Sequence, residues 1–360
     1  MIVLVIVFDN ESDGAFLTAR NITTLLRQTA TIAILAAGVA LLILMAEIDL
    51  SIGSALYLCS VAAAVAHSDF GAGTIVTIAA AITTGLLLGL WQALLVVVLK
   101  IPSFIATLGG LLAFRSIGLV LTDSSPIGMG RTFSALSESR LPGVISYAAV
   151  AVLAVAVILG VARSTRKQRA QHSNSVNIVR SIVLLTLLGL GVVVALWLIT
   201  EQGLPAAAVW VFGVGALMWF LTTRTIFGRN AYVIGANREA AYLSGIPVKK
   251  HMVIAFTVMG VLYGVAAVVE AARLGAVSPQ TGNLMELDAI AAAVIGGVAL
   301  RGGVGTVVGA MLGALLLSTI DNGLIFISGL DANWQPAIKA VILLVALAAD
   351  LAMQRRAGKT

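Results

Sequence analysis

The sequence predicts an all-α polytopic membrane protein of about 11 or 12 transmembrane helices, some broken or re-entrant, in one domain over residues 1–360. Hydrophobic residues make up 60% of the chain, and its mean hydropathy is +1.06. Charged residues make up 11%, against about 25% in soluble domains, which is too few to form the polar surface of a soluble protein of this length. The composition therefore indicates a membrane protein.

Eleven apolar stretches with few charges are long enough, or nearly so, to cross a bilayer. They lie near residues 30–46, 52–66, 74–99, 104–121, 144–162, 181–199, 205–223, 252–272, 288–300, 304–320 and 336–352. The apolar segment Ile2–Phe8 would reach only about 10 Å as a helix, against a hydrocarbon core of about 30 Å. We interpret it as the remainder of a first span whose start is missing, which would make twelve.

Lys and Arg residues predict the orientation, because cytoplasmic loops are enriched in them. Fifteen of the 22 fall in one set of alternate loops and five fall in the opposite set. The richer set comprises 100–103, 163–180, 224–251, 301–303 and 353–360, and the poorer set carries Arg20, Arg27, Arg131, Arg140 and Arg273. The richer set and the C-terminus are thus predicted to be cytoplasmic. The net charge of +6 then reflects topology, and no nucleic-acid partner is expected.

Glycine is abundant, with 36 residues, and recurs at four-residue spacing in three of the predicted spans. The pairs are Gly85 and Gly89, Gly260 and Gly264, and the series Gly305, Gly309 and Gly313. Small residues at this spacing let membrane helices approach closely. Packing within the chain is the favoured interpretation, and a homodimer face is the alternative.

Two acidic segments interrupt the apolar pattern, although a charge at membrane depth costs at least about 2.5–3.5 kcal/mol. In the first, Glu47, Asp49 and Ser51 precede Gly53, which can break a helix. In the second, Glu286 and Asp288 end the polar segment 273–288. Both are predicted to be broken or re-entrant elements that line a path, and their shared acidic-x-acidic pattern suggests two related halves. A turn at the membrane surface and an ordinary external loop are the alternatives.

A third polar region near the end of the chain combines amides with an indole, as sugar recognition requires. It contains Asn322, Trp334 and Gln335. Trp at a membrane boundary is more often an interface anchor, which is the favoured interpretation of Trp334.

The stretch 224–251 is predicted to contain a capped helix of about seven residues. Asn237 is a suitable N-cap, Glu239 lies in the first turn, and Gly245 is placed to end the helix. We predict that this helix docks in a groove of another protein, with a short helix lying on the bilayer as the alternative. The docking residues are Asn237, Glu239, Ala240, Ala241, Tyr242, Leu243 and Gly245.

Motifs for catalysis and for metal binding are missing from the sequence. It contains no phosphate-binding G-x-x-x-x-G-K-[ST] loop, no G-x-S-x-G and no H-E-x-x-H. One cysteine, Cys59, and three histidines form no metal-ligand pattern. We therefore expect neither an enzyme nor a bound cofactor, and any ATP-driven step requires an ATPase on another chain.

Several of these segments resemble one family of sugar permeases. Ile48-Asp-Leu-Ser-Ile-Gly-Ser54 resembles the G-I-D-L-S-V-G-S signature of the ribose/xylose/arabinose/galactose permeases. Glu239-Ala-Ala-x3-Gly245 resembles the EAA-type cytoplasmic loop of ATP-binding cassette (ABC) importer permeases. Further matches are Ile101–Gly109, Glu286–Gly297, Gly302–Gly305 and Asp321–Gly323, so the resemblance runs from about residue 20 to the last span.

Within the family, the xylose-type permeases are the most similar. The basic linker and two added spans near 163–223 resemble their insertion, and the segment 273–283 and Trp334-Gln335 agree. Departures are Ala46-Glu47, where many members have two glycines, and Arg301, where a small residue is usual. The loop 224–251 would be the coupling loop.

The resemblance implies the membrane-spanning subunit of a bacterial inner-membrane sugar importer, with D-xylose as the expected sugar. Implied partners are an ATPase subunit that binds ATP and Mg, a periplasmic sugar-binding protein, membrane lipid and a second copy of the chain. The candidate path residues are Glu47, Asp49, Ser51, Phe104, Thr107, Glu286, Asp288, Asn322, Trp334 and Gln335. The alternatives are a permease for another pentose or a hexose, and a proton-coupled transporter that uses the acidic residues.

Overall fold

The computed structural model describes residues 1–152 and 177–327, with scattered positions at 154–158 and 334–348. The labelled helices before residue 152 are α1 (Ile2–Glu11), α2 (Ala19–Leu44), α3 (Ile52–Ser68), α4 (Thr74–Ala93) with a π-helical extension (Leu94–Val98), α5 (Ser103–Leu121) and α6 (Gly130–Glu138), and a further apolar helix covers Gly143–Val152. Those after residue 176 are α8 (Asn177–Glu201), α9 (Ala207–Arg224), α10 (Ile226–Ala236), α11 (Arg238–Leu243), α12 (Val248–Leu274), α13 (Met285–Ile295) and α14 (Val307–Leu324). Strands β1 (Ile127–Gly128) and β2 (Ala276–Val277) pair antiparallel.

The prediction of an all-α membrane protein is confirmed. In the described part of the chain, six helices are long and apolar enough to cross a membrane: Ala19–Leu44, Thr74–Val98, Ser103–Leu121, Ala207–Arg224, Val248–Leu274 and Val307–Leu324. The predicted span 288–300 corresponds to the eleven-residue α13, which is too short to cross alone. The linker up to residue 176, Gln335 and most of the span 336–352 lie outside the described residues.

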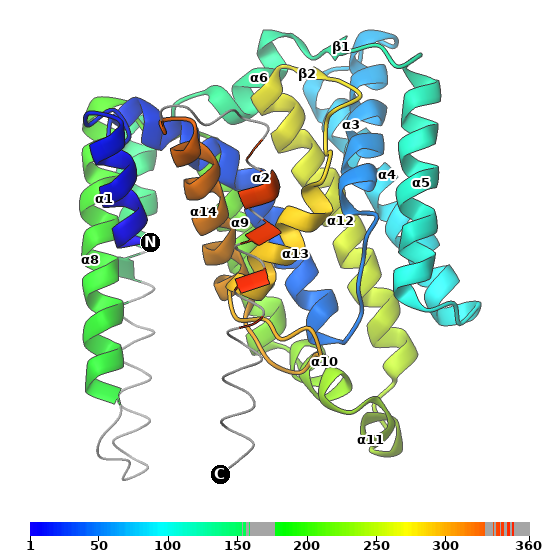
Figure 1. Ribbon diagram of the computed structural model, residues 1–360. Helices are drawn as coiled ribbons and strands as arrows, with labels where there is room; N and C mark the ends of the chain where they lie inside the picture. Colours follow the sequence, from blue (N-terminus) through cyan, green and yellow to red (C-terminus); the bar gives the residue numbers. More distant parts are fainter. Residues whose placement is uncertain are drawn as a thin grey trace.

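Two helices that run in opposite directions, α2 and α12, are each followed by a non-helical segment that turns back into the bundle (Figure 1). Helix α2 runs toward the end of the bundle where α10 and α11 lie, the chain turns back through 45–51, and α3 starts part of the way up the bundle. Helix α12 runs the other way, the chain returns through β2 and the segment 278–284, and α13 starts inside the bundle. Both predicted breaks are therefore present. The first break is the segment 45–51 between α2 and α3, and the second break is the segment 278–284 between β2 and α13. Their inverted arrangement supports two related halves.

Helix α2 ends for a local reason that the sequence contains. Glu47 donates its backbone N–H to the carbonyl of Leu42, and Ala46 donates to Ile43, which is the Schellman pattern of a helix end. Ala46 carries the left-handed φ of +60° that this pattern requires. Glycine is favoured at that position, so the alanine adopts it at a cost of about 1 kcal/mol.

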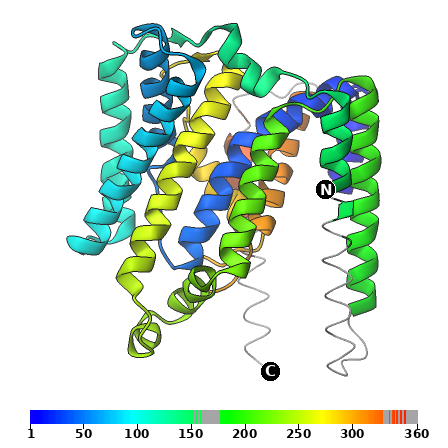
Figure 2. The same ribbon diagram turned by 180° about the vertical axis from the view of Figure 1, so that it is seen from behind.

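The centre of the bundle is formed by α2, which lies between α9 and α12 when seen from behind (Figure 2). Its side chains from Thr29 to Leu44 are all buried. Helix α1 packs against α14, where the Phe8 ring contacts the backbone at Gly323.

Glycines set the closest helix contacts, as their spacing predicts. A Cβ added to Gly85 would lie 2.2 Å from the carbonyl oxygen of Gly260, which brings α4 and α12 into backbone contact. A Cβ on Gly309 would lie 2.2 Å from the carbonyl oxygen of Gly296, and one on Gly313 would lie 2.0 Å from that of Ala292. Packing within the chain, rather than between two copies, therefore accounts for these glycines.

Replacement of Gly260 by valine should separate α4 from α12. Even the Cβ would lie 2.4 Å from the Gly85 carbonyl oxygen, and overpacking of this kind costs about 1–3 kcal/mol or more. We expect a lower melting temperature in detergent and a lower yield of monodisperse protein. Gly213→Val is the matched control, since a Cβ there meets nothing within 4 Å. Equal melting temperatures for the two variants would contradict the packing argument.

Candidate functional site

The two breaks meet inside the bundle through their glycines. A Cβ on Gly53 would lie 2.1 Å from the carbonyl oxygen of Gly282, and one on Gly282 would lie 2.3 Å from that of Gly53. Glu286 lies in the first turn of α13, and its Oε2 would be 2.5 Å from a Cβ added to Gly53. The amino ends of α3 and α13, where the helix dipoles are positive, thus come together around a carboxylate.

Asp49 holds the first break in shape. Its Oδ1 accepts hydrogen bonds from the backbone N–H and the hydroxyl of Ser51, both at 2.7 Å, and its Oδ2 accepts one from the hydroxyl of Tyr263 on α12. The amide of Gln92 donates to the Ser51 hydroxyl at 3.2 Å. Because Asp49 is 3% exposed and both of its oxygens have donors, its carboxylate joins the start of α3 to α12.

Helix α5 satisfies backbone groups of both breaks. The Ser103 hydroxyl accepts from the N–H of Ile48 at 3.3 Å, and the Thr107 hydroxyl accepts from that of Leu50 at 3.0 Å. Further along the helix, Arg115 Nη1 donates to the carbonyl oxygens of Pro279 at 3.1 Å and Thr281 at 2.8 Å. A broken helix leaves such groups without helical partners, and α5 replaces these partners with side chains.

Arg115 is the most unusual of these residues, because it is a cation within an apolar span. Its guanidinium lies 4.8 Å from the ring centroid of Tyr57, in addition to its two carbonyl acceptors. Arg115 lies within the predicted span 104–121 and was not among the candidate path residues. Its charge at that depth was the available signal for a functional role.

Other candidate path residues occupy different places. Thr107 is fully buried, whereas Phe104 is 51% exposed on the outer face of α5. Asp288 lies with Glu286 in the first turn of α13 and is partly buried. Asn322 is buried in α14, where its Oδ1 accepts from the side chain of Asn21 at 2.8 Å. Trp334 is 58% exposed. The structure therefore gathers Asp49, Ser51, Thr107 and Glu286 at the breaks and places Asn322 elsewhere.

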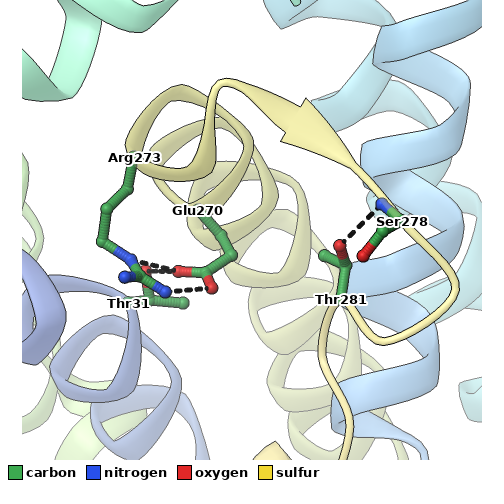
Figure 3. A network of polar contacts seen from close by, with 5 residues as sticks. All are labelled: Thr31, Glu270, Arg273, Ser278 and Thr281. Atoms are coloured by element: carbon green, nitrogen blue, oxygen red, sulfur yellow. Dashed lines mark hydrogen bonds and ion pairs between the residues drawn. The ribbon is translucent and has the colours of Figure 1, made fainter. Parts of the chain in front are cut away.

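A buried carboxylate that the sequence analysis missed lies near the end of α12 (Figure 3). Glu270 accepts from the Thr31 hydroxyl at 2.8 Å and from Arg273 Nε at 3.0 Å and Nη2 at 2.6 Å. Beyond β2, the Thr281 hydroxyl accepts a hydrogen bond from the N–H of Ser278 at 3.0 Å. The Thr31–Glu270 bond ties α2 to α12 close to the point where the chain enters the second break.

The predicted helix in the loop 224–251 is confirmed as α11, which projects from the end of the bundle (Figure 1). The Asn237 side chain accepts from the N–H of Ala240 at 2.9 Å, and Gly245 has a φ of +78° just beyond the helix. Tyr242 and Leu243 are 72% and 77% exposed, while Ala241 is buried. Two large side chains on a projecting helix form a surface suited to a partner.

A cavity of about 960 Å³ lies beside α11. Its lining includes the charged side chains Glu47, Lys100, Arg238, Glu239, Lys249 and Lys250. In the described ranges, no group of three or more His, Cys, Asp or Glu side chains is placed to hold a metal ion.

A bundle of long apolar helices, two breaks that meet within it and a capped helix projecting at one end define a multi-pass membrane permease. The chain belongs to the family described as "branched-chain amino acid transport system / permease component", which matches residues 21–347. This family membership indicates a transport subunit rather than an enzyme. No solved structure matches the chain significantly.

Curated relatives cover almost the whole chain. It is 38% identical to the xylose transport system permease protein XylH of Escherichia coli (strain K12), over 99% of this chain and 91% of that protein. It is also 38% identical to XylH of Haemophilus influenzae, over 98% of this chain and 95% of the relative. Identity to the ribose import permease protein RbsC of Escherichia coli (strain K12) is 33%, over 93% of this chain and 87% of that protein.

Loss of the Tyr263 hydroxyl should destabilise the conformation of the first break. Tyr263→Phe removes the donor to Asp49 Oδ2, and a hydrogen bond to a charged group contributes about 1.5–3 kcal/mol. We expect a lower melting temperature in detergent and faster hydrogen exchange in 48–54. Tyr147→Phe, which alters a 48% exposed tyrosine, is the control. Unchanged exchange in 48–54 would show that the bond does not hold the break.

Proposed function

We propose that this chain is the membrane-spanning subunit of an ABC importer that moves a monosaccharide, D-xylose, into the cytoplasm. The observation that carries the proposal is the 38% identity to xylose permeases over nearly the whole chain, against 33% to a ribose permease. The basic insertion near 163–223 agrees with this choice.

The proposal assigns a partner to each end of the bundle. The described loops that are rich in Lys and Arg lie at the end where α10 and α11 are found, so this end faces the cytoplasm, and the C-terminus is assigned to the same side. An ATPase subunit, which binds ATP and Mg, docks on α11, and a periplasmic sugar-binding protein docks at the opposite end. The proposal includes a homodimer with the path between the copies, in which the exposed face of α5 that carries Phe104 would contact the second copy.

Transport in this proposal uses alternating access around the two breaks. A sugar is neutral, so its hydroxyls need hydrogen-bonding groups rather than a counter-charge. Closure of the ATPases displaces α11, and the inverted pairs α2–α3 and α12–α13 rock against each other. A proton-coupled mechanism through Glu47 or Asp49 is disfavoured, because Glu47 is paired with Arg238 and Asp49 accepts three hydrogen bonds.

Deletion of the gene should abolish uptake of labelled D-xylose at low micromolar concentration in the source cells. We expect rescue by the gene and competition by unlabelled xylose, but not by ribose, arabinose, galactose or glucose. Uptake should also survive a protonophore while cellular ATP is held constant. Unchanged xylose uptake would refute the substrate assignment, and sensitivity to the protonophore at constant ATP would refute the ABC mechanism.

Replacement of Tyr242 and Leu243 by serine should weaken docking of the ATPase. Both side chains are largely exposed, so the fold should survive while the apolar contact is lost. We expect at least a tenfold loss of ATPase co-purified with the permease. The double variant Val144→Ser with Ile145→Ser, which removes two exposed apolar side chains elsewhere, is the control. Equal co-purification of both variants would exclude α11 as the docking element.

A further inference from the structure

The docking helix is joined to the first break by an ion pair. Arg238, the first residue of α11, pairs through Nη2 with Glu47 Oε1, and the same nitrogen donates to the carbonyl of Met45 at 3.4 Å. The Glu47 side chain is 6% exposed, so its charge is almost completely removed from water, while that of Arg238 is 48% exposed. Arg238 thus neutralises a buried carboxylate and also interacts with the carboxyl end of α2.

Backbone contacts hold the same elements together. A Cβ on Gly235, near the end of α10, would lie 1.8 Å from the Leu44 carbonyl oxygen and 2.7 Å from the Gly303 nitrogen. Gly303 donates its N–H to Leu44 at 2.9 Å, and the Tyr232 hydroxyl donates to the carbonyl of Gly305 at 2.9 Å. Helix α10 therefore contacts both the end of α2 and the turn that joins α13 to α14, which are the neighbours of the two breaks.

We propose that the Glu47–Arg238 ion pair transmits displacement of the docking helix to the first break, so that these two are positioning residues for transport. The proposal rests on the function proposed above. Segment 45–51 leads from the pair to the start of α3, where Gly53 contacts the second break at Gly282. Because the Glu47–Arg238 ion pair links α11 to this segment, a displacement of α11 also moves the first break. Without the pair, the loop 224–251 could change conformation while the first break stayed in place.

An ion pair that served only to stabilise the fold would behave differently when removed. Pairs with one exposed partner contribute little to stability, but a buried carboxylate without its partner is unfavourable. A stabilising pair would change the amount of folded protein and leave the sugar imported per ATP unchanged. A positioning pair would lower the sugar imported per ATP in protein that is folded and assembled with its ATPase.

The test compares Glu47→Gln, Arg238→Gln and the double variant in proteoliposomes with the ATPase and binding protein of the system. Import of labelled D-xylose and ATP hydrolysis are measured on the same sample. We expect each single variant to keep its ATPase and at least half of the hydrolysis, while import per ATP falls fivefold or more. The double variant should fall no further than the worse single one, since both changes remove one interaction.

Charge reversal gives a second measurement. Glu47→Lys combined with Arg238→Glu should recover at least half of the import per ATP lost in Glu47→Lys alone. Arg229→Gln and Glu201→Gln, which remove exposed charges elsewhere, are the controls and should leave the ratio unchanged.

Several results would overturn the proposal. These are unchanged import per ATP in both single variants, losses that multiply in the double variant, loss of the ATPase together with import, and aggregation of the glutamine variants. Absence of ATP-dependent import by the wild-type protein would instead refute the proposed function, and this inference with it.

Discussion

The backbone contact between Gly53 and Gly282 is the constraint on which the rest of the bundle depends. Two interrupted helices can meet there only if neither position carries a Cβ. Their meeting leaves peptide groups of segments 45–51 and 278–284 without helical partners among apolar helices, where an unpaired peptide group is unfavourable. Most of the buried polar side chains described above serve to satisfy or position these two segments.

These polar side chains occupy three levels along the bundle. Thr31 and Glu270 join α2 to α12 at one end, and Asp49, Thr107 and Arg115 support the breaks at the centre. Glu47 and Arg238 join the start of the first break to α11 at the other end. The closest contacts between helices are made through glycines, which allow close approach but provide little directional bonding. The bundle thus combines close glycine contacts with a small number of side-chain hydrogen bonds and ion pairs. These hydrogen bonds and ion pairs lie near the two segments where the helices are interrupted.

The elements that could be predicted from sequence are those with local causes. Helix α11 was predicted with its cap and its end, because Asn237 and Gly245 act within one turn of the helix. Both breaks were predicted from acids beside glycine, and the glycine spacing predicted close helix contacts but not that α4 would pair with α12. The partners of the breaks could not be predicted, because Tyr263 lies 214 positions from Asp49 and Arg115 lies 166 from Thr281. Glu270 was missed because a hydropathy window averages one acid into an apolar span.

The opposite directions of the two interrupted pairs have a consequence for the energetics of the transport cycle. If two halves with one architecture face opposite sides of the membrane, exchanging their conformations converts an arrangement open to one side into an arrangement open to the other. Perfectly equivalent halves would make these two arrangements equal in free energy. The halves here differ in their anchors, since the end of α2 is held by Arg238 and the end of α12 has its own internal pair, Glu270 and Arg273. In the proposed transport cycle, this asymmetry would give the resting protein a preferred side, and the free energy of ATP would only have to reverse that preference.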